Sequence, residues 1–136
     1  MFELFEHTAD LGLRVTAHSL DELLVEAARG LLAMLVANPD TVRPVQEKAF
    51  HLSADDNSLL LFDWLSELLY TFETDKLLFS KFDLRLHDDQ LSAVCRGERV
   101  DFSRHQMEHE VKAITYHGLR VEQSAEGWQA ELIVDI

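Results

Sequence analysis

Acidic side chains stand at the ends of predicted strands, where they could bind a metal ion. Asp10 directly precedes a strand-like run, and Asp135 is the penultimate residue, beside the terminal carboxylate of Ile136. If the fold brings Asp10 to that end, three carboxylates converge and repel one another unless a hard cation or a lysine neutralises them. Lys112 could be that lysine, or it could face a partner. An Asp10 that caps a turn and an Asp135 in a frayed end explain the same residues equally well.

A second arrangement that could do chemistry is the H-x-x-E-H pattern from His105 to His109. On a helix, His105 and His109 would share one face and could bind zinc. The flanking residues show no amphipathic pattern, and a third protein ligand is not evident. A solvated connecting segment with surface histidines explains the pattern better, so a small zinc hydrolase that uses His105 and His109 is a remote alternative. The other histidines show no ligand spacing, and they are His7, His18, His51, His87 and His117.

The apolar stretch over residues 58–72, SLLLFDWLSELLYTF, predicts the helix around which the rest of the chain packs. Asp63, Glu67 and Thr71 recur every fourth residue and form one narrow polar stripe, and a helix that is apolar elsewhere is mostly buried. The run 55–58 offers several N-caps. The stretch is too short for a membrane span and carries acids in its middle, so it predicts a core helix.

A second helix is predicted over residues 20–35, since Ser19 and Glu22 match a capping box and leucines and alanines follow at helical spacing. Alternating residues predict strands, and a polar, irregular segment is predicted over 97–104. Two helices and six or more strands, mostly in hairpin order, predict one α+β domain over residues 1–136 with a largely antiparallel sheet. The predicted strands are 2–5, 11–17, 50–52, 82–86, 91–96, 111–116, 118–123 and 128–135.

Composition narrows the function. The formal charge is −13, from 12 basic and 25 acidic residues, and no basic run is present. Strong direct nucleic-acid binding is therefore not expected. Basic proteins or cations are suitable partners, and acidity that simply keeps the protein soluble explains the charge at least as well. The single cysteine, Cys95, lies in an apolar run and is expected to be a core residue. The N-terminus does not resemble a signal peptide, so a cytoplasmic protein is expected.

Four separated stretches form a specific combination, namely EHTADLGLRV, LLLFDWLSELLYTFETDKLLFSKF, VDFSRHQMEHEVKAITYHGLRV and GWQAELIVDI. In this order and over nearly the full length, they resemble the archease family. The resemblance implies two helices on a partly barrel-like sheet. It also implies a non-catalytic accessory protein of the RNA-splicing ligase, which promotes guanylylation and multiple turnover of that ligase in tRNA splicing and RNA repair. The alternative is a chaperone or modulator of RNA-processing enzymes such as a tRNA methyltransferase.

The resemblance also assigns a site. It implies a metal site at Asp10, Asp135 and Ile136, the last through a main-chain or terminal oxygen, with calcium as the ion and magnesium as the alternative. The functionally important lysine of the family corresponds to Lys112, so Asp10, Lys112 and Asp135 are expected to act on the partner. Oxygen-only ligands suit calcium or magnesium and not zinc, which agrees with this assignment.

Overall fold

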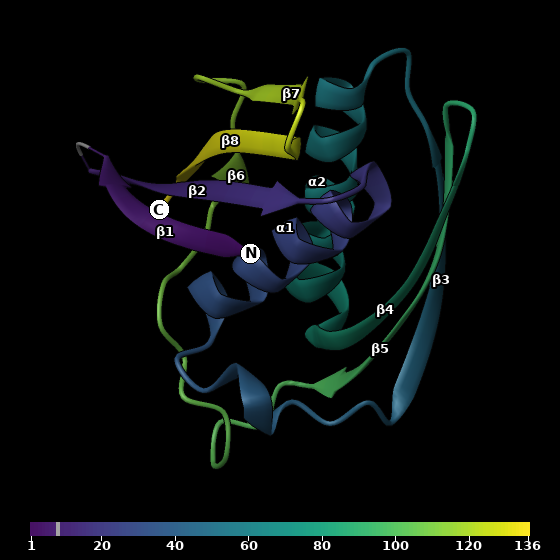
Figure 1. Cartoon of the computed structure of the whole chain (residues 1–136). Coiled ribbons are helices and arrows are strands. Elements are labelled where there is room, and N and C mark those ends of the chain that lie inside the picture. Colours follow the sequence, from purple (N-terminus) through teal and green to yellow (C-terminus); the bar gives the residue numbers. More distant parts are fainter. Residues whose placement is uncertain (8) are drawn as a thin grey trace.

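The computed structural model describes residues 1–7 and 9–136, and Thr8, in the polar stretch 7–10, lies outside the described residues. In this part of the chain, two α-helices lie between two antiparallel sheets (Figure 1). This arrangement confirms the predicted α+β class with antiparallel pairing. The strands form two open sheets, and the described residues contain no closed barrel.

The first sheet contains five strands, which are β1 (Phe2–His7), β2 (Asp10–Ala17), β6 (Ala113–Ile114), β7 (Arg120–Ser124) and β8 (Gly127–Asp135). Their order is β1-β2-β8-β6, and β7 also pairs with β8. β2 and β8 pair antiparallel from Asp10 opposite Asp135 to Ala17 opposite Trp128. Leu13 and Leu132 are opposite each other in this pair and fully buried, so the face that they share covers the helices.

Helix α1 (Leu20–Leu35) has the bounds that the sequence predicts. The Ser19 side chain accepts a hydrogen bond from the Glu22 backbone N–H, and the Glu22 carboxylate accepts one from the His18 backbone N–H at 3.3 Å. The first contact satisfies a backbone donor that the helix N-terminus leaves unpaired, and the second connects the residue before the cap to the first helical turn. Gly30 lets the helix approach β2 closely, since a Cβ atom there would lie 2.5 Å from the Leu13 side chain.

Helix α2 (Asn57–Asp75) is the predicted core helix, extended at both ends. Asp56 is its N-cap and accepts a hydrogen bond from the Leu59 backbone N–H at 2.8 Å. Trp64 is fully buried, and its indole N–H donates to the Leu24 carbonyl of α1 at 2.9 Å. Thr71, a member of the predicted polar stripe, is buried. Its hydroxyl donates a hydrogen bond to the Glu67 carbonyl at 2.9 Å. The hydroxyl therefore does not require a solvent-exposed face.

The second sheet contains β3 (Gln46–Ser53), β4 (Leu77–His87) and β5 (Gln90–Arg99) in the order β3-β5-β4. It forms the long twisted ribbon on the far side of the helices from the first sheet (Figure 1). The register between β4 and β5 shifts between Phe79 and Lys81, which marks a bulge. Phe50 of β3 packs edge-on against Trp64 and Phe79, so the ribbon is joined to the aromatic core.

Several predicted segments differ in extent from the observed elements. The strands predicted over 50–52 and 82–86 run over Gln46–Ser53 and Leu77–His87. Residues 97–99 belong to β5 rather than to an irregular segment, because Gly97 and its neighbours pair with β4 across the bulge. The strand predicted over 111–116 is reduced to Ala113–Ile114. Thr115 instead uses its backbone N–H and its hydroxyl to bind the Ile133 carbonyl, which ends regular pairing there.

Candidate functional site

A row of polar residues crosses one end of the five-stranded sheet. Asp10 of β2 is directly opposite Asp135 of β8, and His7 of β1 is directly opposite Asp10. Directly opposed residues of antiparallel strands point to the same face, with Cβ atoms about 4.5–5.5 Å apart. The neighbouring pair, Leu11 and Val134, is buried on the other face. The outer face of the sheet therefore carries His7, Asp10 and Asp135 on three adjacent strands, and this set is called the outer row below.

A short connection places the first two members of the outer row opposite each other. Ala9, which precedes Asp10, has a φ of 66°, in the left-handed region. An L-residue other than glycine pays roughly 1–2 kcal/mol for that conformation. Tight hairpin turns often need a positive φ, and Asp88 in the β4–β5 turn also has one, of 54°, so this conformation belongs to the hairpin and does not by itself mark a site.

The remaining predicted residues adjoin the outer row. The Lys112 backbone N–H donates to the Asp135 carbonyl at 2.7 Å, and Ala113 is directly opposite Asp135. The Lys112 side chain is exposed, and no described carboxylate lies within ion-pair distance of its ammonium group. Ile136 is half-buried and packs against the hydrophobic core, which holds it next to Asp135. The fold thus gathers all the predicted site residues at one end of the sheet.

The side chains of the outer row carry atoms that can bind a divalent cation, but they do not lie close enough together to hold one without moving. Like charges directly opposite each other destabilise a sheet, so Asp10 and Asp135 favour a cation between them. In the described part of the chain, no group of three His, Cys, Asp or Glu side chains is arranged to hold a metal as it stands. The ligand set Asp10, Asp135 and Ile136 therefore stays a prediction with which the placement is compatible.

Two histidines lie close together at this end of the sheet, His7 in the outer row and His117 beside it, although neither shows ligand spacing in the sequence. His7 Nδ1 lies 3.9 Å from an oxygen of Asp10, and the His7 and His117 rings lie 5.4 Å apart between centroids, tilted by 58°. The spacing of His7 and Asp10 across a hairpin connection is a signal that could have identified the first histidine. His117 carries no such local signal, because only the fold brings it to His7.

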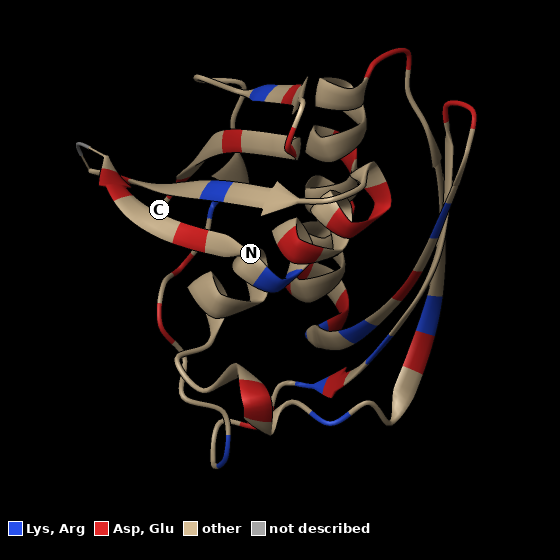
Figure 2. Ribbon diagram, viewed as in Figure 1, with Lys and Arg blue, Asp and Glu red and all other residues tan. Residues whose placement is uncertain are grey.

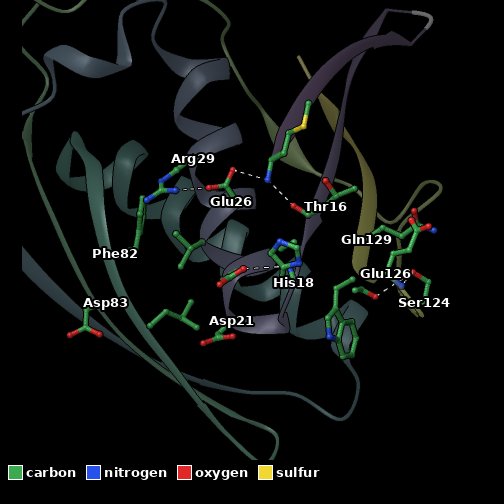
Figure 3. Close-up of a pocket in the computed structure, with 17 residues that line it drawn as sticks. Thr16, His18, Asp21, Glu26, Arg29, Phe82, Asp83, Ser124, Glu126 and Gln129 are labelled. Carbon is green, nitrogen blue, oxygen red and sulfur yellow. Dashed lines mark hydrogen bonds and ion pairs between the residues drawn. The ribbon is translucent and has the colours of Figure 1, made fainter.

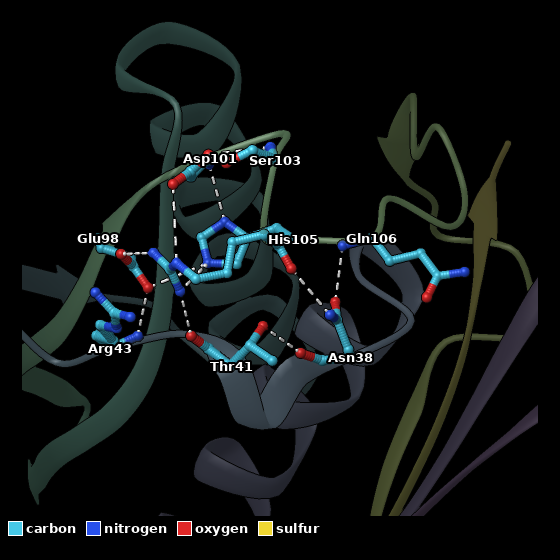
Figure 4. Close-up of polar contacts among 9 residues, drawn as sticks. Asn38, Thr41, Arg43, Glu98, Asp101, Ser103, His105 and Gln106 are labelled. Atoms are coloured by element: carbon cyan, nitrogen blue, oxygen red, sulfur yellow. Dashed lines mark hydrogen bonds and ion pairs between the residues drawn. The ribbon is translucent and has the colours of Figure 1, made fainter.

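The H-x-x-E-H pattern has a different role from the one that zinc binding would need (Figure 4). Residues 101–110 do not form a helix, so His105 and His109 share no helix face. The His105 side chain is 0% exposed, its Nδ1 accepts from the Asp101 backbone N–H at 2.9 Å, and its Nε2 lies 3.1 Å from a Glu98 oxygen. Both ring nitrogens are therefore occupied, and the zinc hypothesis loses its geometric basis.

Glu98 is the centre of this polar network. Its carboxylate accepts from the Arg104 guanidinium and, at 2.6 Å, from the Arg43 backbone N–H. Arg104 also donates to the Thr41 carbonyl at 2.7 Å. The hydrogen bond from Arg104, followed by those from Arg43 and His105, lowers the pKa of Glu98 to about 2 against the opposing effect of burial. The network joins β5, the loop after α1 and the segment that contains His105, so it is structural.

A groove of about 810 Å³ lies at the other end of β2 from Asp10, between α1, β4 and the β7–β8 turn (Figure 3). Its lining includes Asp21, Asp83, Glu126 and Trp128. The amino group of Met1 donates to the Thr16 carbonyl at 2.7 Å there and pairs with Glu26. The described residues that line the groove include none of the predicted site residues. Acidic residues occur on nearly every element (Figure 2), so the acidity of the groove does not distinguish it.

Neither α1 nor α2 combines the length and the hydropathy of a membrane-spanning helix, and the described residues contain no other candidate.

Comparison with known proteins identifies the family. The model described as the Archease protein family (MTH1598/TM1083) matches residues 2–136. The archease of Methanopyrus kandleri is 40% identical over 139 residues, which cover 99% of both chains. The archease of Pyrococcus abyssi is 34% identical over 140 residues, which cover 99% of this chain and 98% of that protein.

Two solved structures are similar to this one. The solution structure of protein 1598 of Methanobacterium thermoautotrophicum has a TM-score of 0.86 and 32% sequence identity, and the match covers 99% of this chain and 98% of that one. The crystal structure of an archease, possible chaperone, from Thermotoga maritima has a TM-score of 0.72 at 22% identity, covers 100% and 98% of the two chains, and supports the fold alone. From the full-length match to the family and the close relatives, the chain belongs to the archease family.

Proposed function

We propose that this protein is a non-catalytic activator of an RNA-splicing ligase, and that it promotes guanylylation and multiple turnover of that ligase in tRNA splicing and RNA repair. The working part is the end of the sheet that carries Asp10, Lys112 and Asp135. Asp10, Asp135 and an oxygen of Ile136 hold a divalent cation there, for which the family resemblance implies calcium, with magnesium as the alternative.

The observation that carries the proposal is the direct pairing of Asp10 with Asp135 on adjacent strands. Asp135 is exposed, and Asp10 is partly so. Lys112 lies beside this pair with its ammonium group outside ion-pair distance of the described carboxylates. This end of the sheet therefore presents two carboxylates and the Lys112 ammonium group to a partner. Among the described ion pairs, none joins Lys112 to either carboxylate.

The chemistry of the partner accounts for this arrangement. A ligase active site that binds RNA and nucleotide has a cationic character, so an acidic tip can dock there. Docking accelerates turnover only if the tip has a higher affinity for the activation-competent state of the ligase than for its other states. Such an activator needs no nucleophile or phosphate-binding loop of its own.

The experiment measures ligated RNA per ligase molecule with and without this protein, using excess RNA, GTP and manganese. The expected result is a change from single turnover to multiple turnover. Asp10→Ala and Lys112→Ala are each expected to remove at least about 90% of the stimulation. When residues act together, the loss of one removes nearly as much activity as the loss of all. Tags at the C-terminus are avoided because they would alter the Ile136 oxygens.

Matched controls separate the site from general charge effects. Asp40→Ala and Lys81→Ala remove the same charges at exposed positions away from the outer row and should leave the stimulation intact. The proposal fails if folded Asp10→Ala and Lys112→Ala proteins stimulate the ligase as well as the unchanged protein does.

A chaperone-like module, with an RNA-processing enzyme such as a tRNA methyltransferase as its client, is the second candidate. It is supported by the words "possible chaperone" for the Thermotoga maritima structure. Chaperones of wide client range use large exposed apolar patches. The exposed large apolar side chains described here come from separate segments, namely Met1, Val45, Tyr70, Phe102 and Tyr116. If the protein suppresses the aggregation of unrelated proteins, the chaperone-like candidate is favoured. If it stimulates the ligase and does not suppress aggregation, the activator is favoured.

A further inference from the structure

We propose that His7 and His117 supply nitrogen ligands at the outer row, so that the site prefers a divalent transition-metal ion of the Co²⁺, Ni²⁺ or Zn²⁺ class over Ca²⁺. This inference rests on the cation site of the proposed function and assigns it two further ligands and a different class of ion.

One ring nitrogen of His7 has no hydrogen-bond partner within the part of the chain that the structure describes. This atom, Nδ1, is buried. An oxygen of the Asp10 carboxylate lies 3.9 Å from this nitrogen, which is too far for a hydrogen bond. Buried polar atoms are nearly always satisfied, so an unsatisfied imidazole nitrogen beside a carboxylate needs an explanation. A metal ion between the two groups would satisfy both.

The second histidine lies at a distance that suits a shared ion. The His7 and His117 ring centroids are 5.4 Å apart, and the rings are tilted by 58° rather than stacked. Two imidazoles bound through nitrogens about 2.1 Å from one tetrahedral ion would have centroids roughly 5 Å apart. The observed separation is therefore close to that of two ligands of one metal.

Local hydrogen bonds explain why His117 reaches this position. The Thr115 hydroxyl donates to the Ile133 carbonyl of β8 at 2.8 Å and accepts from the His117 backbone N–H at 3.2 Å. Gly118 then turns the chain with a φ of 65°. The turn is thereby attached to β8, the strand that carries Asp135, and it brings His117 to His7 of β1.

The donor set decides the class of ion. Calcium and magnesium take oxygen ligands, whereas imidazole suits zinc, nickel, copper and iron. Two imidazoles with the Asp10 and Asp135 carboxylates form a mixed nitrogen and oxygen set. Because no three such side chains converge as they stand, binding requires rotation of side chains. The His7 and Asp10 side chains are 41% and 34% exposed, so neither is locked by packing.

The test titrates the full chain with CoCl₂ and follows the visible absorption of Co²⁺, whose position and intensity report nitrogen ligands and coordination number. CaCl₂ is then added as a competitor. The expected result is a spectrum typical of nitrogen ligation that only a large excess of Ca²⁺ reverses. His7→Ala and His117→Ala should each weaken Co²⁺ binding by at least about tenfold. Losing a residue that only supports a metal ligand already weakens metal binding by about that factor, and losing the ligand itself should do at least as much.

Controls keep the test interpretable. His87→Ala removes an imidazole that is 93% exposed at the β4–β5 turn and should leave Co²⁺ binding unchanged. His7→Gln retains a polar side chain without an imidazole, and it replaces His7→Ala if that variant does not fold. The inference is overturned if His7→Gln binds Co²⁺ with unchanged affinity and spectrum, or if the unchanged protein binds Ca²⁺ as tightly as Co²⁺.

The two proposals fail separately. If Asp10→Ala abolishes ligase stimulation while the His7 variants retain full Co²⁺ affinity, the activator proposal stands and this inference fails. If the His7 variants lose Co²⁺ while the protein stimulates no ligase, the metal site stands and the activator proposal fails.

Discussion

Glu98 shows how much of the structure depends on one buried carboxylate. It binds Arg104, the Arg43 backbone and His105, which come from two loops that lie far apart in the sequence. Removing one partner from a buried charged network leaves the others unsatisfied, which costs more than the interaction itself contributes. Glu98→Gln is therefore expected to lower the free energy of unfolding by about 1–3 kcal/mol at pH 7, measured by urea denaturation.

The low pKa of Glu98 also predicts a pH dependence. The carboxyl group has an ordinary value of 4.5 and a folded value of about 2, so between these values only the unfolded state binds the proton. The stabilisation is fully present above pH 4.5 and is lost as the pH falls towards 2. The stability difference between the unchanged protein and Glu98→Gln should shrink over that window. The exposed control Glu73→Gln should show no such change, and an undiminished difference at pH 3 would contradict the argument.

Cys95 is a residue whose chemistry the fold suppresses. It is 0% exposed, and burial raises the pKa of its thiol to about 12. Since the thiolate is the reactive form, we expect no labelling by iodoacetamide at pH 8 in the native state and rapid labelling in urea. The labelling rate should follow the population of unfolded protein. Fast labelling without denaturant would mean that β5 opens locally.

At the scale of elements, Gly97 makes the bulge between β4 and β5 possible. A Cβ atom there would lie 1.7 Å from the Leu78 carbonyl oxygen, and backbone cannot move aside as a flexible side chain can. Gly97→Ala is expected to cost at least about 1–3 kcal/mol of stability, as for overpacked sites.

The comparison for that variant is Gly118→Ala, which meets no atom within 4 Å but has a φ of 65°. It should cost roughly 1–2 kcal/mol for its conformation alone. Chemical denaturation measures both. If Gly97→Ala were the milder change, the bulge would have to relax more easily than its contacts indicate.

At the scale of the whole molecule, charge opposes compactness. The chain carries 25 acidic and 12 basic residues, and red segments occur on both sheets and both helices in Figure 2. Salt screens the resulting repulsion over a distance of about 10 Å at 0.1 M. The melting temperature at pH 7 is therefore expected to rise by a few degrees between about 10 mM and 200 mM NaCl. A falling melting temperature would mean that ion pairs such as Glu98–Arg104 outweigh the net repulsion.

Local pattern was sufficient for the helices and for most strands. The capping residues of α1 and the helical spacing of its leucines predicted both of its ends, and the apolar run around Trp64 predicted a core helix. These features are local, because caps and periodicity involve residues within a few positions of one another. The resemblance to the archease family likewise came from contiguous motifs, and it supplied the candidate site that composition and spacing left open.

Only the tertiary structure decided which residues meet. The pairing of Asp10 with Asp135, the approach of His117 to His7 and the hydrogen bond from the Arg43 backbone to Glu98 all join distant segments. No local period encodes them, because strand register and loop packing are set by the burial of the whole opposite face. The expectation of a solvated segment with surface histidines is wrong for His105, which is buried with both ring nitrogens in contact with Asp101 and Glu98. A pattern of five residues cannot reveal this burial, because it depends on how the whole segment packs.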